Sequence, residues 1–338
     1  MTTPIAAVPD LNAHAARLNA LGYRSAEQVL GAGRSAPAAL ARYLGLDAAG
    51  LNALLAAMHA SVPGAAALAA VARPAHRLGV RLDLMPRRAN FAMAVPASVA
   101  TALPARVDMI GQMRPVRDQG DRGTCVAHAA LAAVEHYWSQ QGTPVDLSRQ
   151  FAYWNCKQHD GYPDEEGTWI AVAMPLLQSD GCPPEQDWPY VMTDIAGNES
   201  QGPAPQVALD DAGQFRIPGF RQLAATAVHD LKAELAGGRP VAFSIPVFDS
   251  WYADNPAVTR SGDITNPIPG ETPDDAHAMC MVGYEDDEDD PALGGGRFLI
   301  RNSWDSTWGT ASSTGTTGYG TIPYSYIARF ALEAFSVG

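Results

Sequence analysis

A stretch of 17 residues at 125–141, CVAHAALAAVEHYWSQQ, restricts the fold more than any other part of the sequence. Its apolar residues lie on every face of a 3.6-residue repeat, so it predicts a helix that is buried on all sides. A second helix is predicted over 167–181, where Pro175 is expected to shorten or kink it. Four β-rich runs follow, at 240–248, 278–286, 297–304 and 318–327. Helices followed by strands predict an α+β domain with two lobes.

The first hundred residues predict a separate helical part and a connector. Four short helices are predicted from residues that suit helix starts, which are Asp10, Ser25 with Gln28, Pro37 and Asp47. The Ser25 helix is expected to end by Gly31. We therefore divide the chain into a small all-α domain at 1–62, a basic connector at 63–102 and a larger domain at 103–338. The small domain is a candidate site for a protein partner.

Charge and hydropathy exclude several classes of partner. The chain of 338 residues has a net charge of −13, with a net of +5 over residues 1–100 and −18 over the rest. An acidic body argues against nucleic acid as a partner. No run of about 18 apolar residues is present, which argues against a membrane span. The first residues, MTTPIAAVPDLNAHAARL, lack the pattern of a Sec signal peptide. We therefore expect a cytoplasmic protein, or one exported without a cleaved Sec signal.

The cysteines do not indicate a metal site. No two of the four, Cys125, Cys156, Cys182 and Cys280, have C-x-x-C spacing, so neither zinc nor an iron–sulfur cluster is expected. Cys280 lies in an apolar run that is typical of a buried strand, whereas Cys156 and Cys182 are either free core thiols or one bridge. The acidic run at 285–290 lacks an EF-hand pattern, which argues against calcium. The sequence thus predicts no metal and no cofactor.

Cys125 stands where a thiol gains nucleophilic character. It follows Gly123 and Thr124 at the predicted start of the 125–141 helix. The unpaired N–H groups and partial positive charge of a helix N-terminus favour the thiolate, which is the reactive form. Attack of this thiolate on a carbonyl requires donors for the developing oxyanion. The Cys125 N–H and the side-chain amide of Gln119 are the expected donors.

A base and its orienting group are predicted from two later strands. His277 lies at the start of one strand-like run and Asn302 at the end of another. Neighbouring strands would bring the two side chains together, with the amide oxygen accepting from the imidazole and holding the ring toward Cys125. His128, one helical turn after Cys125, is interpreted as a packed core residue rather than a second base. We therefore predict a Cys–His–Asn triad.

Three stretches of the chain resemble motifs of the papain family of cysteine peptidases. PVRDQGDRGTCVAHA resembles the family's glutamine and nucleophile motif, HAMCMVGYED its histidine motif, and IRNSWDSTWG its Asn-Ser-Trp motif. The resemblance covers roughly residues 103–330 and implies a papain-like fold, with a helical lobe and an antiparallel β-barrel-like lobe. It also implies that Gly167 and Ala276 border the substrate, and that Trp304 shields the Asn–His hydrogen bond near the leaving group.

The sequence departs from the family pattern at several positions. Arg122 stands where the family usually has a disulfide cysteine, so that disulfide cannot form. Val126 replaces a usual Trp, and Asp305 replaces a usual Gly. Two insertions, the acidic insertion at 285–296 and a second one at 310–316, are interpreted as solvated hairpin tips.

These features predict a cysteine endopeptidase or exopeptidase, a hydrolase that acts on peptide or protein substrates. Two alternatives stay open. One is an acyl transferase or amide ligase that uses the same triad, and the other is a catalytically silent peptide-binding protein. Competent residues at all four predicted catalytic positions argue against the silent protein.

The connector is also expected to regulate the site. Over residues 63–100 it carries five Arg and one Asp, and it leads into a strongly acidic domain. Phe91 and Met93 are candidates for apolar side chains that plug the site, and Arg87 and Arg88 are the charges that flank them. We expect the connector to lie along the site as a pro-region does and to lower activity, as in a zymogen. The alternative is a structural linker to a helical protein-binding module.

Overall fold

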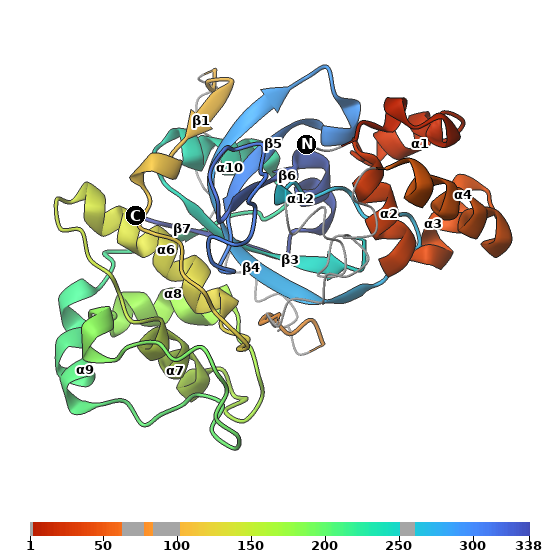
Figure 1. The fold of residues 1–338 in the computed structure, drawn as a ribbon. Helices are drawn as coiled ribbons and strands as arrows, with labels where there is room; N and C mark the ends of the chain where they lie inside the picture. The colour runs from red at the N-terminus through yellow and green to blue at the C-terminus, as the bar shows by residue number, and fades with distance from the viewer. Residues whose placement is uncertain (1–2, 63–77, 84–101, 251–260) are drawn as a thin grey trace.

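The computed structural model describes residues 3–62, 78–83, 102–250 and 261–338. The predicted plugs of the connector, Phe91 and Met93 with Arg87 and Arg88, lie outside these residues. Figure 1 shows an N-terminal group of helices on one side of an antiparallel sheet and a second helical lobe on the other. This arrangement confirms an α+β fold with a helical lobe and a β lobe, preceded by a small helical region.

The N-terminal region consists of short helices with the expected caps. Its helices are α1 (Ala15–Ala20), α2 (Ala26–Ser35), α3 (Pro37–Leu44) and α4 (Ala48–Ser61). The capping box at Ser25 is present, because Ser25 Oγ accepts from the Gln28 N–H at 3.3 Å and Gln28 Oε1 accepts from the Ser25 N–H at 3.1 Å. Asp47 caps α4 by accepting from the Gly50 N–H at 2.7 Å.

Two expected helix boundaries in this region are wrong. Asp10 does not cap the first helix but lies in a 3-10 turn, Pro9–Leu11, which begins at a proline. Helix α2 continues past Gly31 instead of ending there. The helix tolerates its glycines because α2 and α4 pack closely, so that a Cβ at Gly33 would lie only 2.5 Å from the Leu55 side chain.

The helical lobe is built around the helix that begins at Cys125. Its helices are α6 (Cys125–Gln140), α7 (Arg149–His159), α8 (Ile170–Ser179) and α9 (Gln206–Asp211). Every residue of α6 from Cys125 to His136 is buried, as its all-round apolar pattern predicts. Helix α8 is shorter than predicted at both ends, but it runs through Pro175 without a break.

The β lobe is one antiparallel sheet in the described residues. Its strands are β1 (Arg106–Asp108), β2 (Phe220–Gln222), β3 (Val241–Phe248), β4 (Pro273–Asp287), β5 (Gly295–Arg301), β6 (Tyr319–Pro323) and β7 (Glu333–Val337). They are ordered β2-β7-β3-β4-β5-β6, and β1 pairs with β4. The predicted strand at 318–327 is wrong in its second half, because the chain turns at Pro323 into helix α12 (Tyr324–Phe330).

The long strand β4 separates two hydrophobic cores. Ala278, Cys280 and Val282 pack into the core shared with α6, whereas Met279 and Met281 pack into the core on the opposite face. That second core is completed by α12 and by α10 (Val228–Ala236). The alternation follows from the two-residue period of a strand. Because α6 lies directly against β4, the start of the helix and the histidine of the strand come close together.

The N-terminal helices dock on the β lobe. The Asn266 N–H donates to the Leu21 carbonyl at 3.0 Å, and Arg24 forms an ion pair with Asp290 of the acidic insertion. Asn266 Nδ2 also donates to the Ala292 carbonyl at 2.8 Å, and Ala292 is buried. The acidic insertion forms the tip of the β4–β5 hairpin, and Glu288, Asp289 and Pro291 are exposed as expected, but its turn also contacts the N-terminal helices through Asp290.

The structure also answers the question left open for the cysteines. All four cysteines are free and buried, so Cys156 and Cys182 do not form a bridge. Within the described ranges, no helix is both long and apolar enough to cross a lipid bilayer.

Candidate active site

Cys125 is the first residue of α6, and its side chain is fully buried. The Cys125 Sγ accepts from the backbone N–H of Ala278 on β4 at 3.3 Å. This contact places the thiol at the junction of the helical lobe and the sheet, beside His277. The position at the helix N-terminus is the one that the sequence predicts for an activated thiol.

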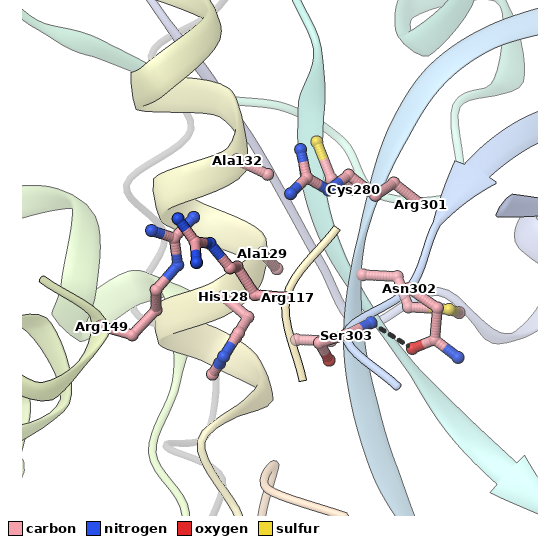
Figure 2. A pocket seen from close by; sticks show the side chains of 11 residues that line it. Arg117, His128, Ala129, Ala132, Arg149, Cys280, Arg301, Asn302 and Ser303 are labelled. Carbon is pink, nitrogen blue, oxygen red and sulfur yellow. Dashed lines mark hydrogen bonds between the residues drawn. The ribbon is translucent and has the colours of Figure 1, made fainter. Parts of the chain in front are cut away.

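His277 and Asn302 form a hydrogen-bonded pair on neighbouring strands. His277 lies on β4, and Asn302 directly follows β5, which ends at Arg301, earlier than predicted. His277 Nε2 lies 2.8 Å from Asn302 Oδ1. The same oxygen accepts from the Ser303 N–H at 2.8 Å, and Figure 2 shows this second bond. Because a carboxamide oxygen can only accept, Nε2 must carry the proton of this bond. In the neutral ring, Nδ1 is then the basic nitrogen.

One tryptophan lies against the histidine, and a second packs on the first. The ring centroids of Trp304 and His277 lie 5.0 Å apart, and Trp308 meets Trp304 edge-on at 6.4 Å. Both tryptophans are buried. Two expected roles of Trp304 stay predictions, namely that it shields the His277–Asn302 hydrogen bond from water and that it lies beside the leaving group.

Gln119 is buried and held on both ends of its amide. Its Oε1 accepts from Ser303 Oγ at 2.6 Å, and its Nε2 donates to the Arg122 carbonyl at 2.8 Å. The Gln119 N–H also donates to the Ser303 carbonyl, at 2.9 Å. These bonds fix Nε2 as the donor end of the amide. Sequence reasoning missed Ser303 as the residue that orients this amide, although it directly follows Asn302.

A short piece of the connector lies over the site. We call Leu78–Asp83 the covering segment. Its Val80 pairs with Ala276, the residue before His277, through backbone hydrogen bonds of 3.1 and 3.2 Å. The Val80 side chain is fully buried in the core shared with α6. Ala276, which sequence analysis placed at the substrate, therefore contacts the chain's own N-terminal part.

The covering segment also contacts the opposite wall of the site. The Gly79 carbonyl accepts from the Thr168 N–H at 3.0 Å. Gly167 has φ +85°, and a Cβ on it would lie 2.7 Å from the Gly79 carbonyl oxygen. A Cβ on Gly79 would lie only 2.1 Å from the carbonyl oxygen of Gly123, in the turn before Cys125. Glycine is thus required at both positions for the segment to approach this closely.

The burial of the site controls its titration. Burial raises the pKa of the Cys125 thiol to about 12. The N–H groups of Ala278 and Gly79 act in the opposite direction, because they favour the thiolate, but their effect is smaller. Burial also lowers the pKa of His128 to about 3, and His128 Nδ1 contacts the Thr124 carbonyl at 3.1 Å. His128 is therefore a neutral core residue, as the sequence analysis interprets it.

A small cavity lies behind the site, between α6, the interior of β4 and the end of β5 (Figure 2). Its volume is about 10 Å³, and its polar lining consists of Arg117, His128, Arg149, Cys280, Arg301, Asn302 and Ser303. A space of this size holds about one water molecule. It is therefore too small to receive a substrate side chain.

Comparison with known proteins finds a matching family model and similar solved structures. The family model described as papain family cysteine protease matches residues 103–320. Among solved structures, xylellain, a cysteine protease from Xylella fastidiosa, superposes with a TM-score of 0.64 at 27% identity. That match covers 79% of this chain and 97% of the other.

Two curated relatives match a smaller share of their own length. An uncharacterized peptidase C1-like protein of Acanthamoeba polyphaga mimivirus is 26% identical over 224 residues, which is 62% of this chain and 65% of the relative. Peptidase 1 of Dermatophagoides farinae is 26% identical over 225 residues, which is 64% of this chain and 60% of the relative. The chain thus spans less than two thirds of either relative.

Proposed function

Because the chain belongs to the papain family of cysteine proteases, we propose that it hydrolyses peptide bonds of peptide or protein substrates through Cys125, His277 and Asn302. One observation carries the proposal. The thiol at the start of α6 lies against β4 beside His277, whose ring is held by Asn302 at 2.8 Å. A nucleophile, a base and an orienting group in this relation suit acyl transfer from an amide.

The first half of the reaction forms an acyl-enzyme. His277 Nδ1 takes the proton of Cys125 Sγ, and the thiolate attacks the scissile carbonyl carbon. The carbonyl oxygen gains negative charge, which the Cys125 N–H and the side-chain amide of Gln119 stabilise. The imidazolium then gives its Nδ1 proton to the leaving amine, the C–N bond breaks, and a thioester to Cys125 remains.

The second half releases the acid. His277 Nδ1 removes a proton from water, and the resulting hydroxide attacks the thioester carbonyl. The same two donors hold the second oxyanion. The C–S bond breaks, the carboxylic acid leaves, and the imidazolium returns its Nδ1 proton to Cys125 Sγ, which restores the thiol. Throughout both halves Asn302 keeps the ring in the tautomer that leaves Nδ1 toward the thiol.

Replacing Asn302 with Ala should lower kcat by about 10- to 100-fold, because the ring loses its orientation but the nucleophile remains. Steady-state kinetics on a fluorogenic peptide measure the loss. Asn155→Ala is the control, since Asn155 bonds to Asp180 in the helical lobe, away from the site. A kcat of Asn302→Ala equal to that of the parent would contradict the role of Asn302.

The covering segment closes this site in the intact chain. It pairs with Ala276 on one wall and with Thr168 on the other, and it leaves both Cys125 and His277 fully buried. An extended substrate needs the same backbone groups, so the segment and the substrate exclude each other. The support for this gating comes from the residues around Gly79 rather than from the predicted plugs.

The pH dependence of thiol alkylation tests the closed state. Burial raises the pKa of Cys125 to about 12, so near neutral pH the thiol keeps its proton and should react slowly with iodoacetamide. The alkylation rate of the intact chain should therefore rise steadily from pH 7 into the alkaline range. A variant that releases the segment should shift this profile to lower pH, because less burial opposes the thiolate. Fast alkylation at neutral pH in the intact chain would contradict the closed state.

The two alternative functions are separated by their products. A transferase or ligase that uses the same triad would pass the acyl group to an added amine, so a new amide would replace the free acid in the product analysis. A silent binding protein would not be labelled at Cys125 by a peptidyl electrophile. Hydrolysis with labelling of Cys125 supports the peptidase.

A further inference from the structure

A buried arginine lies at the centre of the turn that leads to Cys125. The Arg122 side chain is fully buried. Its guanidinium carbon lies 5.3 Å from the ring centroid of Tyr153 and 5.1 Å from that of Tyr190. A buried cation is costly unless hydrogen bonds and favourable contacts compensate its lost hydration. The two rings supply part of this compensation.

Hydrogen bonds from Arg122 to two separate elements supply the remaining compensation for its lost hydration. Arg122 Nη1 donates to Gln150 Oε1 on α7 at 2.7 Å and to the Val191 carbonyl at 3.0 Å. Arg122 Nη2 donates to the Glu199 carbonyl at 3.4 Å. The side chain thus ties the turn before Cys125 both to helix α7 and to the loop that contains Val191 and Glu199.

The same elements hold Gln119. The Arg122 carbonyl accepts from Gln119 Nε2 at 2.8 Å. The Tyr190 hydroxyl, from the ring that stacks on Arg122, donates to the Gln119 carbonyl at 2.8 Å and lies 2.6 Å from Thr124 Oγ1. Movement of the Arg122 side chain would therefore displace the proposed oxyanion donor from two directions.

We propose that Arg122 is a positioning residue for the oxyanion donor Gln119, acting as a non-covalent tie. No covalent tie is present here, because all four cysteines of the chain are free. The inference rests on the proposed peptidase function, since it assigns Gln119 to the oxyanion. It predicts that changes at Arg122 act on transition-state stabilisation rather than on substrate binding.

The shape of the guanidinium carries this role. Arg presents donors in a fixed plane that also stacks on aromatic rings, whereas Lys presents one point charge on a flexible stem. A lysine at position 122 keeps the charge but cannot reach three acceptors and stack at once. Arg122→Lys therefore keeps the positive charge but removes the set of hydrogen bonds and ring contacts that holds the turn.

The experiment compares kcat, KM and the affinity of a peptide aldehyde. An aldehyde adds to the thiol and places an oxyanion where the reaction places one. Arg122→Lys should lower kcat and aldehyde affinity by about 10- to 100-fold. This loss should not exceed the loss of kcat that follows when an oxyanion donor is removed. KM should change little. In a Gln119→Ala background, Arg122→Lys should have almost no further effect, because residues that act as a unit are not additive.

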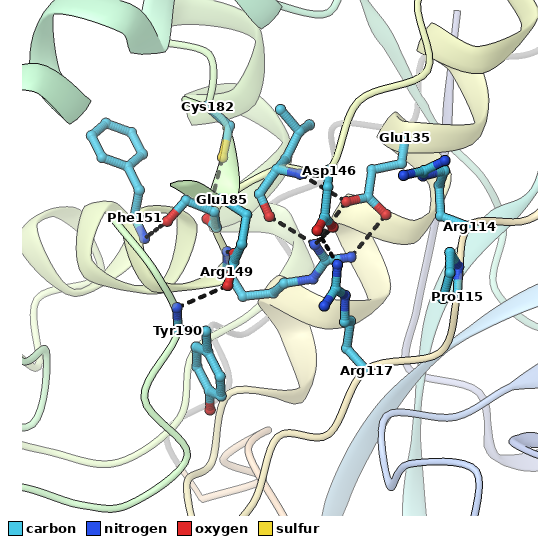
Figure 3. Close-up of polar contacts among 12 residues, drawn as sticks. Arg114, Pro115, Arg117, Glu135, Asp146, Arg149, Phe151, Cys182, Glu185 and Tyr190 are labelled. Atoms are coloured by element: carbon cyan, nitrogen blue, oxygen red, sulfur yellow. Dashed lines mark hydrogen bonds and ion pairs between the residues drawn. The ribbon is translucent and has the colours of Figure 1, made fainter. Parts of the chain in front are cut away.

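Arg149→Lys is the matched control. Arg149 is equally buried in the helical lobe, between the carboxylates of Glu135 and Asp146 (Figure 3), at 2.8 and 2.7 Å. Both lysine variants should lower the melting temperature, but only Arg122→Lys should lower kcat and aldehyde affinity. If Arg122→Lys does not fold, Tyr190→Phe replaces it, since it removes the bond to the Gln119 carbonyl and keeps the ring. The same losses, on a smaller scale, are then expected.

The outcomes separate this inference from the proposed function. One outcome would refute the positioning role of Arg122 and leave the peptidase proposal intact. In it, Gln119→Ala loses kcat, whereas Arg122→Lys and Tyr190→Phe keep it. Equal effects of Arg122→Lys in the presence and absence of Gln119 would also refute this role. Full activity of Cys125→Ala would instead refute the peptidase itself.

Discussion

Cys125→Ala is expected to lose hydrolysis of a casein-type substrate, with kcat falling by at least about 10⁴-fold, while the fold is retained. The thiol forms the covalent bond of every turnover in the proposed mechanism, and Ala offers no atom that can replace it. The folded state should persist because only one buried sulfur is removed from the end of α6. Proteolysis assays and circular dichroism measure the two expectations.

Cys280→Ala is the matched control for this change. Cys280 is also a free, buried cysteine, and it lies on β4 in the core shared with α6. The same sulfur is deleted, but outside the predicted triad, so activity should be kept. Equal activity of Cys125→Ala and the parent protein would refute the peptidase proposal. Loss of activity in both variants would indicate damage to the core instead.

Much of the site follows from local sequence patterns. The all-round apolar run after Cys125 predicts a buried helix, and the helix is buried through His136. The alternation along β4 then decides which residues face that helix. A strand that turns Ala278 toward α6 also fixes the neighbouring His277, and the end of β5 brings Asn302 within 2.8 Å. These are consequences of periodicity and of neighbouring strands.

Other features depend on contacts between segments that are distant in sequence. Pro323 ends β6 and starts α12, although the residues after it alternate as a strand does. The orientation of Gln119 depends on the Ser303 hydroxyl, which only the folded chain brings near. Gly79 carries no motif at all. Its importance lies in the 2.1 Å that would separate its Cβ from the Gly123 carbonyl oxygen.

This close approach makes Gly79→Ala an activating change. The added Cβ would collide with the backbone of Gly123, so the covering segment must move away from its position over the site. The segment then loses its backbone hydrogen bonds to Thr168 and Ala276. Such bonds each contribute about 1 kcal/mol, so the uncovered population and the measured kcat/KM should rise by about 10-fold or more. The assay uses the full-length chain and a small fluorogenic peptide.

Gly111→Ala is the control for this prediction, because a Cβ at Gly111 would meet no atom within 4 Å. Val80→Asp should release the covering segment by a second route, since it places a charge in a buried apolar site and leaves the contact with Gly123 unchanged.

Salt should also activate the parent, because it screens the ion pair of Arg81 with Glu165, whose charged atoms lie 2.9 Å apart at the surface. Salt should not activate Gly79→Ala, where the segment has already left. Unchanged kcat/KM in both Gly79→Ala and Val80→Asp, with both proteins folded, would show that the segment does not restrict the site and would favour a linker to the N-terminal helices.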